Sequence, residues 1–368
     1  MADLLKFIHE DADTIIAELK ADLETRLNRQ LAPADVEMLL VQALAYREML
    51  LRANINDAAR QNLVAFSRGA ALEYIGELVG VYRLPAASAA CTIQFTLVNG
   101  HTGVQISEGL RVQSTDGKAI FRTIEAVVVN PGTLTVNVNA KCSTAGKIGN
   151  GYTSNKINII LDPQPYLTAA QNTDTSSGGA DEELDEDLRE RIKLAPASFS
   201  VAGPVDAYIF FAKSASSAIV DVAVTSPVPG QVNIYPLLEN GALPTQAILD
   251  AVLAICNGDK CRPLTDTVIV DSPTIQNYAI NVQLTLLTKA VNTNADTTVL
   301  QALTAWKDSR KNRLGLDVVR NKIASMAMLD GVVYNVNVVS PAADIVATPE
   351  VYTNCTGITV TIIGTADE

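Results

Sequence analysis

The stretch spanning residues 178–227, GGADEELDEDLRERIKLAPASFSVAGPVDAYIFFAKSASSAIVDVAVTSP, predicts a glycine break, a helix, a turn, a second helix and a strand. Six carboxylates fall within residues 181–187, where the positive end of a helix dipole favours negative charge. Asp181 is the expected helix cap. Arg189, Arg191 and Lys193 are expected at the far end of the helix, where the dipole favours positive charge. The acidic run is therefore interpreted as a solvated capping turn.

The same stretch also predicts where its two helices pack and end. Proline disfavours the interior of a helix and is well suited to its first position, so Pro196 ends the first helix and Pro204 opens the second. The first helix is expected to carry one apolar stripe, because three apolar residues recur at every fourth position. These residues are Leu184, Leu188 and Ile192.

Residues 1–84 have a helical pattern, with a long helix predicted from residue 33 to about residue 66. Some 30 residues without an internal Gly or Pro would form a rod of roughly 45 Å. One apolar stripe follows this helix and is our candidate partner interface. Its members are Val36, Leu40, Leu44, Leu51 and Ile55. The alternative is that the helix packs on its own N-terminal neighbour and on residues 70–82.

Residues 85–165 change to a period of two, which predicts a β-rich domain. Ile93, Phe95 and Leu97, for example, alternate with polar residues. Residues 130–133, Asn-Pro-Gly-Thr, favour a type II turn and predict a hairpin between the strands on either side. Residues 166–180 are rich in Thr, Ser, Gly, Gln and Asn and predict an extended linker.

The remaining chain alternates helices and strands, and we divide it into α+β domains at residues 181–290 and 291–368. Apolar positions in residues 205–226 recur in residues 319–340, and each segment ends at the serine of a Ser-Pro pair. Internal duplication and convergence on a common helix–strand pattern both explain this similarity. The predicted fold class is multidomain α+β, with an N-terminal helical region, a central all-β domain and C-terminal α+β domains that are either duplicated or convergent.

Composition argues against several classes of function. A formal net charge of −12 disfavours nucleic-acid binding, which depends on clustered Lys and Arg. No run approaches the ~18 apolar residues that a membrane span needs, and the first residues lack the pattern of a signal peptide. Five scattered cysteines are expected to be free thiols in the core, as in a reducing compartment.

Residues that carry chemistry are scarce. The two histidines, His9 and His101, are expected on the surface, and they lie too far apart in sequence to suggest a catalytic or metal site. Cys256 and Cys261 lack a second pair for zinc and are expected to be a thiol pair at a helix end. We therefore expect no cofactor, no metal and no enzymatic activity.

Three blocks resemble one protein family. They are GGADEELDEDLRERI with APASFSVAGPVDAY and IVDVAVTSPVPG in residues 178–230, IGELVGVYRLPA at residues 75–86, and CRPLTDTVIV at residues 261–270. In this order they resemble baseplate J-like proteins, which are wedge components of contractile phage tails of the P2 and Mu type. The resemblance samples about residues 70–290 and implies a structural assembly protein of the virion tail baseplate, made in the host cytoplasm.

The resemblance also implies partners. These are a second copy of the chain, a smaller baseplate wedge protein, and hub, spike and sheath-proximal baseplate proteins, with no nucleic acid and no membrane span. The alternative is a carbohydrate-binding or carbohydrate-degrading tail protein, which needs paired carboxylates or exposed aromatic platforms. The single tryptophan, Trp306, lies at core spacing in a predicted helix and does not suggest such a platform.

Overall fold

The computed structural model describes residues 5–200, 202–258, 261–263, 265–290 and 293–367. The chain forms two compact units. One contains the chain up to Tyr82 together with Leu188–Lys193, and the other contains Arg83–Asp187 and the chain from Leu194 onward. The fold is mixed α and β in several domains, as the sequence predicts.

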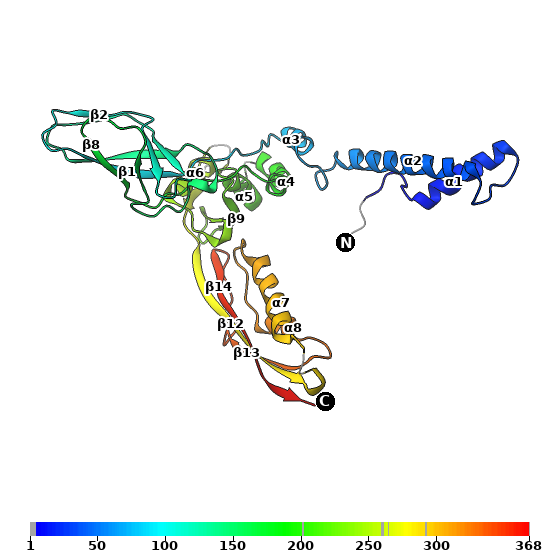
Figure 1. Ribbon diagram of the computed structural model, residues 1–368. Coiled ribbons are helices and arrows are strands. Elements are labelled where there is room, and N and C mark those ends of the chain that lie inside the picture. The colour runs from blue at the N-terminus through cyan, green and yellow to red at the C-terminus, as the bar shows by residue number, and fades with distance from the viewer. Residues whose placement is uncertain (1–4, 201, 259–260, 264, 291–292, 368) are drawn as a thin grey trace. The chain divides into compact units, whose positions relative to one another are not determined.

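The first unit is built from helices α1 (Ala12–Leu27), α2 (Val36–Arg60) and α3 (Ala70–Glu77). α2 is 25 residues long, or about 37 Å at 1.5 Å per residue. It is shorter than the predicted helix at residues 33–66 because Asp35 occupies the cap position and because residues 61–66 form turns. α1 packs along α2 as a helical hairpin, the α1–α2 arm (Figure 1).

A six-stranded antiparallel sheet dominates the next part of the chain, in the order β7-β3-β4-β6-β1-β8. Its strands are β1 (Ala90–Leu97), β3 (Arg111–Ser114), β4 (Ile120–Thr123), β6 (Thr135–Cys142), β7 (Ile157–Ile160) and β8 (Leu167–Asn172). The edge strands β7 and β8 contact each other, so the sheet nearly closes into a barrel. Two short strands, β2 (Val104–Ile106) and β5 (Val127–Val129), pair separately.

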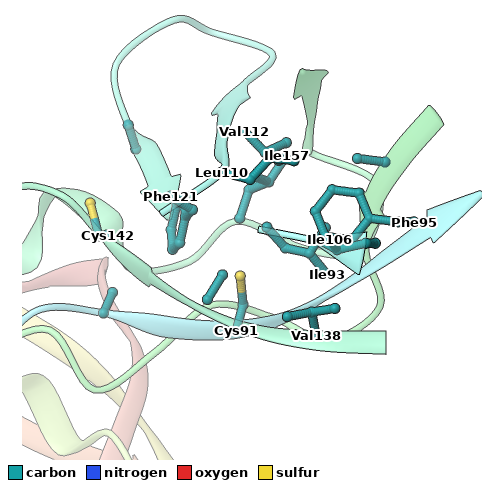
Figure 2. Close-up of a cluster of buried hydrophobic side chains, with 14 of the residues drawn as sticks. Cys91, Ile93, Phe95, Ile106, Leu110, Val112, Phe121, Val138, Cys142 and Ile157 are labelled. Carbon is teal, nitrogen blue, oxygen red and sulfur yellow. The ribbon is translucent and has the colours of Figure 1, made fainter. Parts of the chain in front are cut away.

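The barrel core follows from the period of two, which sends alternate side chains inward. Ile93 and Phe95 of β1 are fully buried, as predicted, and meet Val112, Phe121 and Val138 from other strands. Figure 2 shows these side chains converging between the strands. This interior is a continuous apolar cluster.

Two predictions for this region are wrong. Residues 166–180 are not a linker, because β8 lies within them and pairs antiparallel with β1. The turn at residues 130–133 exists, with a 3.2 Å bond from Thr133 N to Asn130 O, but its flanking strands do not pair as a hairpin. β5 pairs with β2, whereas β6 pairs with β1 and β4.

The chain after α4 (Asp185–Leu194) builds a small mixed sheet in the order β11-β10-β9. Its elements are α5 (Val205–Lys213), β9 (Ile219–Thr225), β10 (Gln231–Leu238), α6 (Gln246–Cys256) and β11 (Thr267–Val270). β10 is antiparallel to β9 and parallel to β11. Helices α5 and α6 pack on this sheet and share its core.

A second mixed sheet follows in the order β13-β12-β14. Its elements are β12 (Thr274–Leu287), α7 (Ala295–Arg310), α8 (Arg320–Ala327), β13 (Val333–Ser340) and β14 (Val351–Ala366). α7 and α8 lie along one face of the sheet (Figure 1). The predicted boundary at residue 290 is wrong, because β12 is the central strand of this sheet and belongs with the elements after it.

The two segments with similar sequence patterns are each a helix followed by a strand, α5–β9 and α8–β13. Both strands are edge strands that pair antiparallel with the central strand of their sheet. The topology around them differs. The strand after β9 is that central strand, β10, whereas the strand after β13 is the opposite edge strand, β14.

Candidate assembly interface

The α1–α2 arm buries only one side of α2. Val41 and Ala45 of α2 and Ile15 of α1 are at most 2% exposed. Asn56, also fully buried, accepts hydrogen bonds from the backbone N–H groups of Phe7 (2.8 Å) and Ile8 (3.0 Å). The chain before α1 is thereby held against α2, and this covered side contains little of the predicted stripe.

All five residues of the predicted interface lie on the open side of α2. We call Val36, Leu40, Leu44, Leu51 and Ile55 the α2 stripe. Each of these side chains is between 53 and 71% exposed. The alternative prediction is correct in part: α2 packs on its N-terminal neighbour α1, but in the described chain this contact leaves the α2 stripe exposed.

A second apolar line accompanies the α2 stripe. Leu39, Tyr46 and Leu50 are 66%, 60% and 44% exposed. At about 3.6 residues per turn they fall beside the α2 stripe on the side away from Ile55. α2 is therefore apolar on its covered side and over most of its open side. Such a distribution is typical of a helix that is buried on all sides.

Charged residues pair at the connection between α1 and α2. Arg29, in the α1–α2 connection, pairs with Asp35 (2.8 Å) and Glu37 (2.7 Å). A hydrogen bond from the Ala32 N–H, followed by the contact with Arg29, lowers the pKa of Asp35. These ion pairs leave the apolar side chains of the α2 stripe uncovered.

The signature helix α4 contributes two buried arginines to the same unit as the arm. Arg189 is 8% exposed and donates to the carbonyl oxygens of Val64 (2.7 Å) and Ser67 (2.6 Å). Arg191 is 4% exposed and donates to the carbonyl oxygen of Tyr82 at 2.6 Å. Sequence reasoning assigned both residues to the helix dipole and missed these contacts, since no local pattern reveals which distant carbonyls they bind.

Tight packing around α3 explains one glycine of the second sequence block. A Cβ atom at Gly76 would lie 2.7 Å from the Val81 carbonyl oxygen and 3.2 Å from the Ile192 side chain. Any larger residue would push the chain after α3 away from α4. Gly76 therefore lets α4 approach the backbone closely.

The acidic run differs from its prediction as a solvated capping turn. The helix begins at Asp185, so Asp181 is not its cap and instead accepts from the Lys147 N–H at 2.9 Å. Glu183 is 5% exposed and accepts from the Leu84 N–H at 2.9 Å. Asp185 pairs with Arg83 at 2.6 Å. Part of the acidic run thus binds the segment that precedes β1, at Arg83 and Leu84.

The predicted stripe of this helix is also only partly correct. Leu188 and Ile192 are buried, but Leu184 is 70% exposed. Leu184 precedes the first helical residue, so the spacing of the helix does not apply to it.

Profiles of known protein families match the N-terminal helical region, the barrel and the first mixed sheet separately. The family profile described as Baseplate J-like N-terminal domain matches residues 34–89, and the Baseplate J-like protein barrel domain matches residues 92–179. The Baseplate J-like central domain matches residues 200–272. The chain belongs to the baseplate J-like family.

Two baseplate proteins illustrate the similarity. Baseplate protein J of Escherichia phage P2 is 33% identical over 203 residues, which are 55% of this chain and 66% of that protein. A chain in the cryo-EM structure of the anti-feeding prophage (AFP) baseplate, 6-fold symmetrised, aligns with a TM-score of 0.47 and 13% identity. That alignment covers 93% of this chain and 92% of the other.

In this baseplate J-like chain, the residues considered for chemistry are mostly enclosed. His101 is 3% exposed, so its surface prediction is wrong; it accepts from the Gly103 N–H at Nδ1 (3.2 Å), and Nε2 then donates to the Thr133 carbonyl (2.8 Å). His9 lies by Glu18 near the surface. All five cysteines are buried and free, and burial raises the pKa of the Cys91 thiol to about 12.

The described residues give little support for a metal site, a sugar-binding aromatic face or a membrane span. Within the described ranges, no three His, Cys, Asp or Glu side chains gather where they could hold a metal ion. Trp306 is 8% exposed and therefore offers no open ring face for a sugar. No helix in the part of the chain that the structure describes is long and apolar enough to cross a membrane.

Proposed function

We propose that this chain is a structural wedge subunit of a contractile-tail baseplate and that the α2 stripe is where it joins its neighbours. The observation that carries the proposal is five large apolar side chains, each more than half exposed, on a helix whose opposite side is already packed. Membership of the baseplate J-like family supports the baseplate, and the name of the P2 relative agrees.

Burial of the stripe gives assembly its driving force. Covering a Leu, Val or Ile side chain completely stabilises by about 1.5 to 3 kcal/mol. Five half-covered residues therefore contribute on the order of several kcal/mol, before the cost of association is subtracted. The partners that fit are helices of a second copy and of a smaller wedge protein. Hub, spike and sheath-proximal proteins complete the proposed baseplate, which assembles in the host bacterial cytoplasm.

In this proposal the chain works by holding other proteins in place and needs no cofactor or catalytic group. The baseplate ring holds the sheath until a rearrangement triggers contraction. The chain contributes folded domains and a helical arm with an exposed apolar surface to that ring. Carbohydrate binding gains no support from the positions of Trp306 or of the acidic run.

The test is the double variant Leu40→Asp/Leu51→Asp, measured by sedimentation with the neighbouring tail proteins. The two positions are eleven residues apart and share a face of α2. Two charges in a dry contact between helices should abolish association. The free subunit should still melt cooperatively, because both side chains already face water.

The matched control is Ala17→Asp/Ala21→Asp, which adds the same charges to exposed positions of α1. It should associate like the unmodified chain. Normal association of the Leu40/Leu51 variant would contradict the proposal, as would a folded unmodified chain that stays monomeric in every mixture.

A further inference from the structure

A small pocket lies between the C-terminal turn of α7 and the first residues of β14. Its volume is about 150 Å³, and the side chains that decide its chemistry come from α7 and its C-cap residue, from β12 and from β14. They are Tyr278, Lys307, Arg310, Lys311, Tyr352 and Asn354. We call this the cation pocket. None of the residues that line it is an Asp or a Glu.

The three cations have no carboxylate partner in the described part of the chain. Among the described residues, no ion pair within 4.0 Å involves Lys307, Arg310 or Lys311. In contrast, Arg26, Arg29, Arg52 and Arg68 in the first unit are all paired. Unpaired positive charge concentrated in one pocket is unexpected in a chain with a net charge of −12.

Arg310 is also held in place at this pocket. Its Nη2 donates to the Asp317 carbonyl oxygen at 2.5 Å, and its guanidinium carbon lies 4.6 Å from the centre of the Trp306 ring. Its Nε is buried without a hydrogen-bond partner in the described chain. The α7 dipole favours cations here, but a dipole does not account for a fixed guanidinium with an unused donor.

Two buried tyrosines add hydroxyl donors. Tyr352 is only 4% exposed, and its side-chain hydroxyl makes no hydrogen bond within the residues that the structure describes; Tyr278 is 8% exposed. Burial raises the pKa of Tyr278 to about 12 and raises that of Tyr352 as well. Both hydroxyls therefore keep their protons at neutral pH. Fixed donors and unpaired cations without a carboxylate are what an oxyanion requires.

We propose that the cation pocket binds a carboxylate presented by an acidic segment of a neighbouring protein chain. The pocket is smaller than the about 300 Å³ at which small-molecule sites begin, so it fits one oxyanion group and not a whole sugar or nucleotide. The protein source of the carboxylate rests on the assembly role proposed above. Inorganic phosphate shares the chemistry and is the other source to test.

The only tryptophan of the chain reports directly on this pocket, because Arg310 stacks on it. Trp306 fluorescence of the full chain is followed during titration with acetate, inorganic phosphate or a blocked peptide of alternating Asp and Glu, at constant ionic strength made up with chloride. Acetate should give a saturable change, and the acidic peptide should saturate at a concentration at least about tenfold lower, since it can place several carboxylates near the three cations.

Three variants locate the binding. Lys307→Gln/Lys311→Gln should weaken peptide binding at least about tenfold, because it removes two charged contacts. Tyr352→Phe keeps the packed ring and should weaken binding about threefold through loss of one donor. Lys118→Gln/Lys141→Gln removes the same charge from exposed barrel positions and should bind like the unmodified chain.

Several results would overturn the proposal. One is a fluorescence change that depends only on ionic strength, and another is unchanged peptide binding in both pocket variants. Saturation by phosphate but not by the peptide would replace the protein carboxylate with a free phosphate. The titration needs no partner protein, so its failure is separate from a failure of the α2 stripe to associate.

Discussion

The barrel and the α1–α2 arm use apolar residues in opposite ways. In β1, every second residue from Cys91 to Leu97 is at most 5% exposed. In α2, eight large apolar side chains are exposed, and only Met38, Val41, Ala45 and Asn56 are buried. The barrel therefore completes its core within one chain, whereas α2 leaves most of its large apolar side chains exposed.

The difference teaches that apolar content alone does not separate a core from an interface. What separates them is whether the pattern has a covering surface within the same chain. A nearly closed sheet supplies its own cover, because the inward sides of its strands face one another. A two-helix arm covers one side of each helix and cannot cover the rest.

The largest expected effect is a loss of stability caused by a substitution in the barrel core. Phe95→Ala should lower the free energy of unfolding by about 3 to 5 kcal/mol, because it empties a fully buried position. Leu40→Ala on the α2 stripe should cost less than about 1 kcal/mol, since its side chain is already largely in water. Urea unfolding of both variants measures this difference. Equal costs at the two positions would show that the arm is covered in the free chain.

A smaller loss of stability is expected in the first unit, where a buried arginine is compared with an exposed one. Arg189→Met should cost about 2 to 3 kcal/mol, because the carbonyls of Val64 and Ser67 lose a charged donor in a buried place. Arg26→Met, which breaks an exposed ion pair with Asp22, is the control and should cost less than about 0.5 kcal/mol. Thermal unfolding and amide exchange of residues 64–68 report the change. An unaffected Arg189→Met variant would mean that water replaces the arginine there.

The smallest effect concerns an exposed ion pair of the barrel. The side chain of Arg111 lowers the pKa of Asp162 to about 2, below its ordinary 3.8. The stabilisation is therefore present above about pH 4 and is lost as the pH falls toward 2. Carbon-detected NMR titration should find this midpoint, and Arg111→Gln should return it toward 3.8.

A midpoint near the ordinary value in the unmodified chain would show that this pair does not persist in solution. Because both side chains are solvent-exposed, unfolding near neutral pH should change little in Arg111→Gln. The contrast between barrel and arm then rests on apolar burial and not on surface charge.

Sequence alone predicted elements whose residues follow one clear period. The alternation at Ile93, Phe95 and Leu97 correctly indicated a strand with one buried side. It failed at β8 because three of its six residues, Thr168, Gln171 and Asn172, are polar, and the segment around the strand has the polar composition of a loop. The buried Asn172 at its end accepts from the N–H groups of Lys156 and Ile157, both at 2.9 Å, a role that apolar periodicity does not reveal.

The candidate site was predictable only in part. The α2 stripe was named from its spacing, and the structure shows its residues exposed. Sequence could not show which side of α2 its own neighbour α1 covers. The roles of Arg189 and Glu183 were missed because their partners lie far away in sequence; Arg189 and Val64 are 125 positions apart. The cation pocket also depends on such distant contacts.

The parallel pairing of β12 with β14 has a consequence for the order of folding. Asn277 and Asn354, neighbours in this pair, are 77 positions apart, and α7, α8 and β13 lie between the two strands. Closing so long a loop costs entropy before the sheet returns any stabilisation, and parallel pairing with distant contacts is slow. During synthesis the barrel strands, which all precede Thr173, can pair early, whereas β12 has to remain unpaired with β14 until that later strand leaves the ribosome. A truncation before Val351 would thus leave the central strand of that sheet with one open edge.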